Sequence, residues 1–404
     1  MEHRFLAFRR EALKPRRAAG DIKMARETIK IENAGQRGGS EERRRPLHGF
    51  GAAGVAMDAY GAAFDAFGHW AKDAFFGAAS PATPAAGGEA TWHVTAREPE
   101  SGFESGEFEC SLGELEYRLW VPKKAQDLIN AGKKPAVIVF LHGCKQTADS
   151  FADGARAREQ AENGGFIALC PQQSPKENGW RCWNWFRREN QSRSGGEAAL
   201  IAFLAHCAQE RFLADPRKMG VMGLSAGGAM SIALSTLFPD IFSVAASHSG
   251  LPFGAAQDLQ GALGAMRGGV ARAAVSPQVP VIVFQGTQDK TVDPINGERS
   301  LRRGLDERPA SKSEKRINGR LVNVERFDAH AELPRAELWT IEGAGHAWSG
   351  GVEGAGYTDV LGPDATVEAL KFFEKIWKEK SSEKIPQISD KSVKTNDGDA
   401  PKRH

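Results

Sequence analysis

Short apolar runs, rich in Val and Ile, recur through the middle of the chain and are separated by longer segments with helical composition. The runs are apolar at successive positions, as expected for strands covered by helices on both faces. Segments 195–212 and 226–238 have the length and composition of helices. The expected strands are PAVIVFLHG (135–143), GFIALCPQ (165–172), KMGVMGLS (218–225), IFSVAASHSG (241–250), PVIVFQGTQD (280–289) and AELWTIEGAGH (336–346).

This alternation predicts an α/β fold with a doubly wound, mostly parallel sheet that carries helices on both faces. The preceding segment FECSLGELEYRLWVP (108–122) is typical of an antiparallel hairpin that leads into the sheet. In such a sheet the ligand site lies at the carboxyl ends of the parallel strands. Residues that follow an expected strand are therefore the first candidates for chemistry.

The two ends of the chain lack this pattern. Phe64, Phe67 and Trp70 are spaced nearly as on one helix face, which predicts an amphipathic helix with an aromatic stripe. We expect this stripe to pack on a neighbouring domain, with contact to an apolar surface such as a lipid or polyester as the alternative. The predicted organisation is a disordered basic tail (1–50), an Ala/Gly/aromatic helix and linker (51–90), a single catalytic domain (91–378) and a disordered tail (379–404).

Charge and hydropathy exclude several classes of protein. The 404 residues carry a net charge of +2, of which residues 1–50 contribute +6 and residues 378–404 contribute +2, so that the rest is net −6. Nucleic-acid binding requires clustered positive charge, so we expect no nucleic-acid partner. The mean hydropathy is −0.42 and no run of about 18 apolar residues occurs, so no membrane span is expected.

The five cysteines are compatible with buried thiols, or with one or two disulfides and an odd thiol. They show no CxxC or Cys/His spacing of the zinc type, so we expect no metal site. The first 20 residues contain no apolar stretch of the kind found in secretory signal peptides.

The strongest local signal for chemistry is Gly223-Leu224-Ser225-Ala226-Gly227, between an expected strand and an expected helix. A nucleophile elbow needs this arrangement, because the serine projects above the sheet and the flanking glycines allow close backbone approach. Glycine is abundant in this chain, so an ordinary strand–helix turn is the alternative. Ser225 is the candidate nucleophile.

A serine nucleophile needs a base oriented by an acid, in the chain order Ser, Asp, His for this kind of elbow. Asp289 and His346 each follow an expected late strand and satisfy that order. Asp293 is the competing acid. His248 is the rival base, but it precedes Asp289 in the chain and is expected in the wall of the site.

Attack on an ester carbonyl creates an oxyanion, which backbone N–H groups can bind. The N–H of Ala226, directly after the nucleophile, is one expected donor. The second is expected from the loop after the first parallel strand, where Cys144 is the best candidate.

Three of the nine tryptophans fall in the segment 179–186, after the second parallel strand. This segment predicts either a packed loop or an apolar platform for an acyl chain or an aromatic acid. On the second interpretation the candidate substrate-binding residues are Trp183, Trp185, His248 and Trp348.

Several motifs follow one another between about residues 105 and 377: LHGCKQ, CWNWF, GLSAGGAM, SHSGLPFGAA, GTQDKTVDP, GAGHAWSGG and YTDVLGPDAT. Taken together, these motifs closely resemble the polyhydroxybutyrate depolymerase family of serine esterases. The resemblance implies an α/β-hydrolase fold, a triad of Ser225, Asp289 and His346, and an oxyanion site at Cys144 and Ala226. It also leads us to expect a disulfide between Cys144 and Cys182, which flank the crevice.

The sequence therefore predicts a serine carboxylesterase of the polyester depolymerase type, which needs no cofactor and acts on a polyhydroxyalkanoate or a small acyl ester. An acetyl-xylan or feruloyl esterase is the alternative within the enzymes. A non-catalytic protein that binds hydrophobic granules through residues 51–78 is a remote alternative. The resemblance implies an extracellular location, whereas the lack of a recognisable signal peptide leaves a cytoplasmic one open.

Overall fold

A computed structural model of the chain describes residues 25–30, 89–98, 101–269, 275–301, 308–330 and 333–382. The expected helix and aromatic stripe at 51–78 lie outside these residues. Of the predicted basic tail, residues 1–50, only Ala25–Lys30 are described, and they form a strand. This strand pairs antiparallel with Glu89–Glu98.

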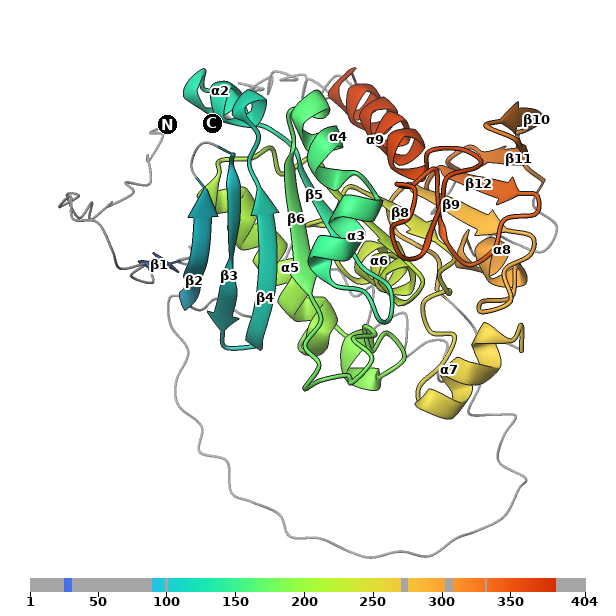
Figure 1. The fold of residues 1–404 in the computed structure, drawn as a ribbon, viewed down its shortest axis with the longest axis horizontal. Helices are drawn as coiled ribbons and strands as arrows, with labels where there is room; N and C mark the ends of the chain where they lie inside the picture. The colour runs from blue at the N-terminus through green and yellow to red at the C-terminus, as the bar shows by residue number, and fades with distance from the viewer. Residues whose placement is uncertain are drawn as a thin grey trace, which may run out of the picture.

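The described strands form one 12-stranded sheet in the order β1-β2-β3-β4-β6-β5-β7-β8-β9-β12-β11-β10 (Figure 1). The six strands from β6 to β12 in this order are parallel, and antiparallel strands extend the sheet at both sides. The bounds are β1 Ala25–Lys30, β2 Glu89–Glu98, β3 Phe103–Cys110, β4 Gly113–Trp120, β5 Val137–Leu141, β6 Ile167–Gln172, β7 Met219–Leu224, β8 Val244–His248, β9 Val281–Gly286, β10 Ser311–Ile317, β11 Arg320–Phe327 and β12 Ala336–Ile341; a separate pair is formed by β13 Trp348–Ser349 and β14 Thr358–Asp359.

Helices cover both faces of the parallel strands. Figure 1 shows α3, α4 and α9 on the viewer's side of the sheet, with α5 and α6 behind it. The bounds are α2 Lys123–Asn130, α3 Ala148–Gly154, α4 Ala157–Gly164, η1 Arg188–Gln191, α5 Gly196–Arg211, α6 Ala226–Leu237, α7 Leu259–Met266, α8 Ile295–Leu301 and α9 Ala365–Ser382. The predicted fold class is therefore confirmed, as are all six expected strands, the hairpin and both named helices.

The alternation of side chains along each central strand explains why the expected strands are apolar at successive positions. In β5, Ile138 and Phe140 pack in the core under α3, α4 and α9. Val137, Val139 and Leu141 pack on the opposite side, in the core with α5 and α6. Both faces are thus buried, and polar residues are excluded until the strand ends.

Candidate active site

Ser225 lies in the tight turn between β7 and α6, at the carboxyl end of the parallel strands. Its backbone has φ 58° and ψ −118°, a conformation that is costly for a residue with a side chain. Its N–H donates to the carbonyl of His248 at 2.9 Å, which fastens the turn to the end of β8. Ser225 is only 8% exposed.

Gly223 and Gly227, which flank the turn, lie so close to neighbouring backbone atoms that a larger residue would not fit. A Cβ on Gly223 would lie 2.4 Å from the backbone of Gly227 and 2.7 Å from the carbonyl oxygen of Leu141. A Cβ on Gly227 would lie 2.1 Å from that same oxygen. The start of α6 therefore packs directly on the end of β5, as a nucleophile elbow requires.

Asp289 follows β9 and His346 follows β12, the neighbouring strand. The Nδ1 of His346 lies 2.8 Å from the Oδ2 of Asp289 and donates its hydrogen to that carboxylate. The other oxygen, Oδ1, accepts the N–H groups of Thr291 and Val292, both at 2.9 Å. The carboxylate is thereby held in one orientation, and it fixes His346 in the tautomer whose Nε2 is free to accept a proton.

The environment of Asp289 keeps it ionised. Burial by itself would raise the pKa of this carboxyl, but the hydrogen bond with His346 and the two backbone N–H groups outweigh it, so the pKa lies below its ordinary value. A carboxylate that stays charged can stabilise positive charge on the imidazole. Among the described residues, the Ser225 hydroxyl makes no direct hydrogen bond with His346, a link that often tightens only when substrate binds.

The competing residues have other partners. Asp293 accepts the N–H of Ile295 at 3.0 Å and so shapes the start of α8. His248 is completely buried: its Nε2 accepts the N–H of Ser349 at 3.2 Å and its Nδ1 lies 3.1 Å from the hydroxyl of Ser249. Burial lowers the pKa of His248 to about 3, with a further contribution from His346, so this ring is neutral at neutral pH, and its place in the wall of the site stays a prediction.

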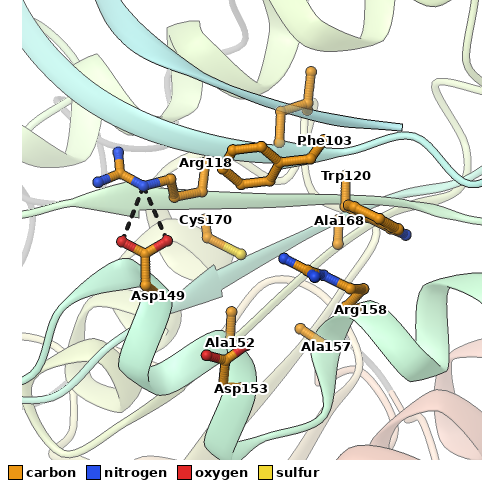
Figure 2. Close-up of a pocket in the computed structure, with 11 residues that line it drawn as sticks. Phe103, Arg118, Trp120, Asp149, Ala152, Asp153, Ala157, Arg158, Ala168 and Cys170 are labelled. Atoms are coloured by element: carbon orange, nitrogen blue, oxygen red, sulfur yellow. Dashed lines mark hydrogen bonds and ion pairs between the residues drawn. The ribbon is translucent and has the colours of Figure 1, made fainter. Parts of the chain in front are cut away.

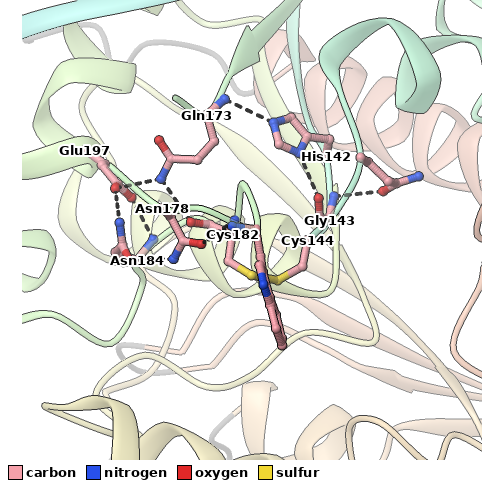
Figure 3. Close-up of a disulfide and its surroundings, with 10 residues drawn as sticks. His142, Gly143, Cys144, Gln173, Asn178, Cys182, Asn184 and Glu197 are labelled. Carbon is pink, nitrogen blue, oxygen red and sulfur yellow. Dashed lines mark hydrogen bonds between the residues drawn. A yellow bond between two sulfur atoms is a disulfide. The ribbon is translucent and has the colours of Figure 1, made fainter. Parts of the chain in front are cut away.

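The two expected oxyanion donors come from the elbow itself and from the loop after β5. Ala226 is the first residue of α6, where helical N–H groups have no partner within the helix. Cys144 follows Gly143, where an added Cβ would lie only 3.5 Å from the Cβ of Ser225. The expected disulfide between Cys144 and Cys182 is present (Figure 3). It joins the loop after β5 to the segment 179–186, which we call the tryptophan-rich loop.

A network of hydrogen bonds around Glu197 fixes the tryptophan-rich loop to α5. The carboxylate of Glu197, on α5, accepts the side-chain amides of Gln173 at 2.7 Å and Asn184 at 2.5 Å, together with the backbone N–H of Asn184 at 2.7 Å (Figure 3). Burial raises the pKa of Glu197, and these hydrogen bonds oppose that effect. Sequence reasoning missed this network, because its members are far apart in the chain and carry no motif.

The four candidate substrate-binding residues lie in the interior. Trp183 and His248 are 0% exposed, Trp348 is 1% and Trp185 is 7%. The ring of Trp348 packs edge-on against Phe151, and its Nε1 donates to Thr366. Because these side chains pack in the interior in this conformation, their burial favours the packed-loop interpretation for the tryptophan-rich loop. A role of the four residues in substrate binding stays a prediction.

Trp180 is the exposed aromatic residue of the same loop, with 68% of its surface accessible. Its carbonyl accepts the N–H of Lys145 at 2.6 Å, and the Nζ of Lys145 lies 5.0 Å from the centre of its ring. Trp180 therefore adjoins the Cys144 side of the site. The sequence placed it in the right segment but could not show which indole faces solvent, since an irregular loop has no periodicity.

A separate pocket lies on the α3–α4 side of the sheet and contains none of the candidate catalytic residues. Arg158 lies within it, and its Cζ is 4.4 Å from the ring centre of Trp120 (Figure 2). The Nε–H of Arg118 is shared between the two carboxylate oxygens of Asp149, each 3.0 Å from Nε. Its lining is Phe103, Arg118, Leu119, Trp120, Asp149, Ala152, Asp153, Ala157, Arg158, Ala168 and Cys170.

None of the described helices is long and apolar enough to cross a membrane.

The sheet order, the strained serine after β7, the carboxylate after β9 and the histidine after β12 define an α/β-hydrolase fold. Residues 115–298 match the family model described as Esterase PHB depolymerase. This match confirms, over that segment, the resemblance inferred from the motifs. The segment contains Ser225 and Asp289 and ends before His346.

Three curated relatives are similar to parts of the chain. Poly(3-hydroxyalkanoate) depolymerase C of Paucimonas lemoignei is 30% identical over 230 residues, covering 52% of this chain and 54% of the relative. Feruloyl esterase B of Neurospora crassa is 33% identical over 119 residues, covering 29% and 40% respectively. Probable acetylxylan esterase A of Aspergillus flavus is 30% identical over 126 residues, covering 31% and 40%. The chain thus spans about half, or less, of the length of these relatives.

Proposed function

We propose that the chain is a serine carboxylic-ester hydrolase of the polyhydroxyalkanoate depolymerase type, with Ser225, His346 and Asp289 as its catalytic triad. The observation that carries this proposal is the Asp289–His346 hydrogen bond, at the same sheet edge as the strained Ser225 turn. The family match over residues 115–298 supports it.

The reaction runs through an acyl-enzyme. His346 Nε2 takes the proton of Ser225 while Oγ attacks the ester carbonyl, and the N–H groups of Cys144 and Ala226 bind the resulting oxyanion. The C–O bond to the alcohol then breaks, and the alcohol leaves with the proton from His346. Water, deprotonated by His346, then attacks the acyl-enzyme carbonyl. The bond between the acyl carbon and Ser225 Oγ breaks, the acid leaves, and His346 returns the proton to Oγ.

A short-chain polyhydroxyalkanoate is the proposed substrate class, in keeping with the depolymerase of Paucimonas lemoignei. Acetyl-xylan or feruloyl esters form the second candidate class, which the similarity to the fungal esterases favours. Release of 3-hydroxybutyrate, acetate and ferulate from the three corresponding substrates, compared for one enzyme preparation, separates these classes. The largest kcat/KM identifies the class, and release of ferulate or acetate alone would contradict the polyester assignment.

Replacing Ser225 tests the catalytic proposal itself. We expect Ser225→Ala to lower kcat for p-nitrophenyl butyrate by at least about 10³-fold, because the covalent intermediate can no longer form. The unfolding transition of the variant, followed by circular dichroism, checks that it remains folded. Ser194→Ala, which alters an exposed hydroxyl, is the matched control and should retain full activity. Turnover by the Ser225 variant at the wild-type rate would refute the proposal.

A further inference from the structure

His248 is a buried histidine that the reaction described above does not use. It is the last residue of β8 and is 0% exposed, so an ester cannot reach its ring in this conformation. Its backbone and its side chain each form hydrogen bonds, and these bonds lead to different members of the candidate triad.

The central sheet fixes the place of His248, and its carbonyl holds the nucleophile turn. This carbonyl accepts the N–H of Ser225 at 2.9 Å. In the parallel ladder, His248 lies beside Leu224 of β7 on one side and Phe284 of β9 on the other, and its ring stacks on that of Phe284 with 5.9 Å between the ring centres. The residue is therefore held between the strand that leads to Ser225 and the strand that leads to Asp289.

The side chain of His248 holds the segment that follows His346. Its Nε2 lies 3.2 Å from the backbone nitrogen of Ser349, and its Nδ1 lies 3.1 Å from the hydroxyl oxygen of Ser249. A backbone N–H can only donate, so Nε2 presents its lone pair and Nδ1 carries the hydrogen, which it donates to Ser249. Burial keeps the pKa of His248 low, which agrees with this neutral ring.

The direction of the Ser349 N–H follows from the short ladder between β13 and β14. The N–H groups of the residues before and after Ser349 donate to the carbonyls of Tyr357 and Asp359, at 2.8 and 2.7 Å. Since successive N–H groups of a strand point to opposite sides, that of Ser349 points away from β14 and toward His248.

Other hydrogen bonds hold the segment 346–350 from the side of α9. The hydroxyl of Ser349 donates to the carbonyl of Pro363 at 2.5 Å, and the preceding indole donates to Thr366 at 3.0 Å. Among the hydrogen bonds of the described residues, the one to His248 joins this segment to β8. The strand that holds the Ser225 turn is thus also the strand that holds the segment of the base.

We propose that His248 is a positioning residue that holds Ser225 and His346 at a fixed separation, because its carbonyl binds the N–H of Ser225 and its Nε2 binds the N–H of Ser349. The inference rests on the proposed function, since the separation matters for proton transfer between Ser225 and His346. A misplacement of about 1 Å between reacting groups can cost about 10²-fold in rate.

Two substitutions separate the two ring nitrogens. A glutamine side chain reaches the position of Nε2 and can accept the Ser349 N–H, whereas an asparagine amide reaches only the position of Nδ1 and leaves that N–H without an acceptor. We expect His248→Gln to keep kcat for p-nitrophenyl butyrate within about threefold and His248→Asn to lower it by about 30-fold, with KM changed by no more than about threefold in both. Active-site titration with a p-nitrophenyl phosphonate counts the molecules whose serine can react.

The leaving group supplies a readout that a loss of folded protein would not move. His346 must protonate the ethanol that leaves from ethyl butyrate, whereas p-nitrophenolate leaves without a proton. A misplaced His346 should therefore cost the Asn variant about tenfold more in kcat/KM with ethyl butyrate than with p-nitrophenyl butyrate. The Gln variant should keep the wild-type ratio of the two rates. His206→Asn, at a partly buried histidine on α5, is the matched control and should leave both rates unchanged.

Equal losses in the Asn and Gln variants, or an equal loss with the two esters, would overturn the inference while leaving the esterase proposal standing. A wild-type chain that hydrolyses no ester would overturn the proposed function and this inference with it.

If the Asn variant does not fold, nitrogen-15 NMR of the wild-type histidines decides, with the His248 signals assigned by nuclear Overhauser effects to the ring of Phe284. A proton on Nδ1 and none on Nε2 at neutral pH supports the inference. A proton on Nε2 would overturn it, because such a ring cannot accept the N–H of Ser349.

Discussion

At the scale of single residues, Ser225 and Asp289 are held by backbone groups more than by other side chains. The elbow is fastened through the N–H of Ser225, and one oxygen of Asp289 is occupied by two backbone N–H groups. Such contacts do not depend on rotamers of neighbouring side chains. The geometry of nucleophile and acid is therefore set by the turns that carry them, before any substrate arrives.

The two acidic residues after β9 provide a matched pair of variants. Asp289→Asn should lower kcat by about 10⁴-fold, because an amide no longer enforces the His346 tautomer whose Nε2 accepts a proton. Asp293→Asn should leave kcat within about threefold, since this side chain serves the start of α8. Steady-state kinetics with p-nitrophenyl butyrate measures both, and a larger loss in the Asp293 variant would reassign the acid.

The positions of the candidate residues are predictable where chain order and strand ends restrict the choice. Asp289 and His346 each follow a late strand, and the structure pairs them at 2.8 Å. Exposure of individual tryptophans was not predictable, because the loop that holds Trp180 and Trp183 has no repeating geometry. Glu197 and the disulfide hold this loop, and only the three-dimensional structure shows these contacts.

At the scale of elements, every central strand was predictable and the outer ones were less so. Central strands are apolar on both faces, which is a strong signal in the sequence. The β10–β11 hairpin was not predicted, because β10 is mostly exposed and its residues, SKSEKRI, are almost all polar. The strand forms because it pairs with β11, a contact that its own polar composition does not predict.

The disulfide between the β5 loop and the tryptophan-rich loop should contribute substantially to stability. Its cysteines are 38 residues apart, and closing a loop of that length stabilises the folded state by about 4 kcal/mol through the entropy of the unfolded chain. We expect the Cys144→Ser/Cys182→Ser double variant to lose about this much unfolding free energy in urea. Wild type treated with a reductant should match it, while Cys110→Ser serves as the control. Identical midpoints with and without reductant would contradict this expectation.

At the scale of the whole molecule, two buried neutral histidines make folding depend on pH. The pKa of His142 is about 4 and that of His248 about 3 in the folded chain, both lowered chiefly by burial, against about 6.5 when unfolded. Below pH 6.5 the unfolded chain therefore binds protons that the folded chain does not. Stability from these residues is fully present above pH 6.5 and is lost as the pH falls toward 4 and then 3.

The expected magnitude is a loss of up to about 1.4 kcal/mol per pH unit for each histidine within this window. Glu197 and Asp364, whose pKa values burial raises, act in the opposite direction, so the measurement compares variants. Urea unfolding at pH 7.5 and pH 4.5 should show a smaller fall in unfolding free energy for His248→Asn than for wild type. Equal falls would mean that His248 is protonated in the folded state.

The charged face of β10 has a consequence for the molecule in solution. β10 is the outermost described strand on its side of the sheet, where unpaired backbone groups could recruit a strand from another chain. Its exposed side chains include Lys312, Glu314, Lys315 and Arg316. Bringing a second chain alongside would strip water from these charges, so the edge of the sheet formed by β10 resists aggregation.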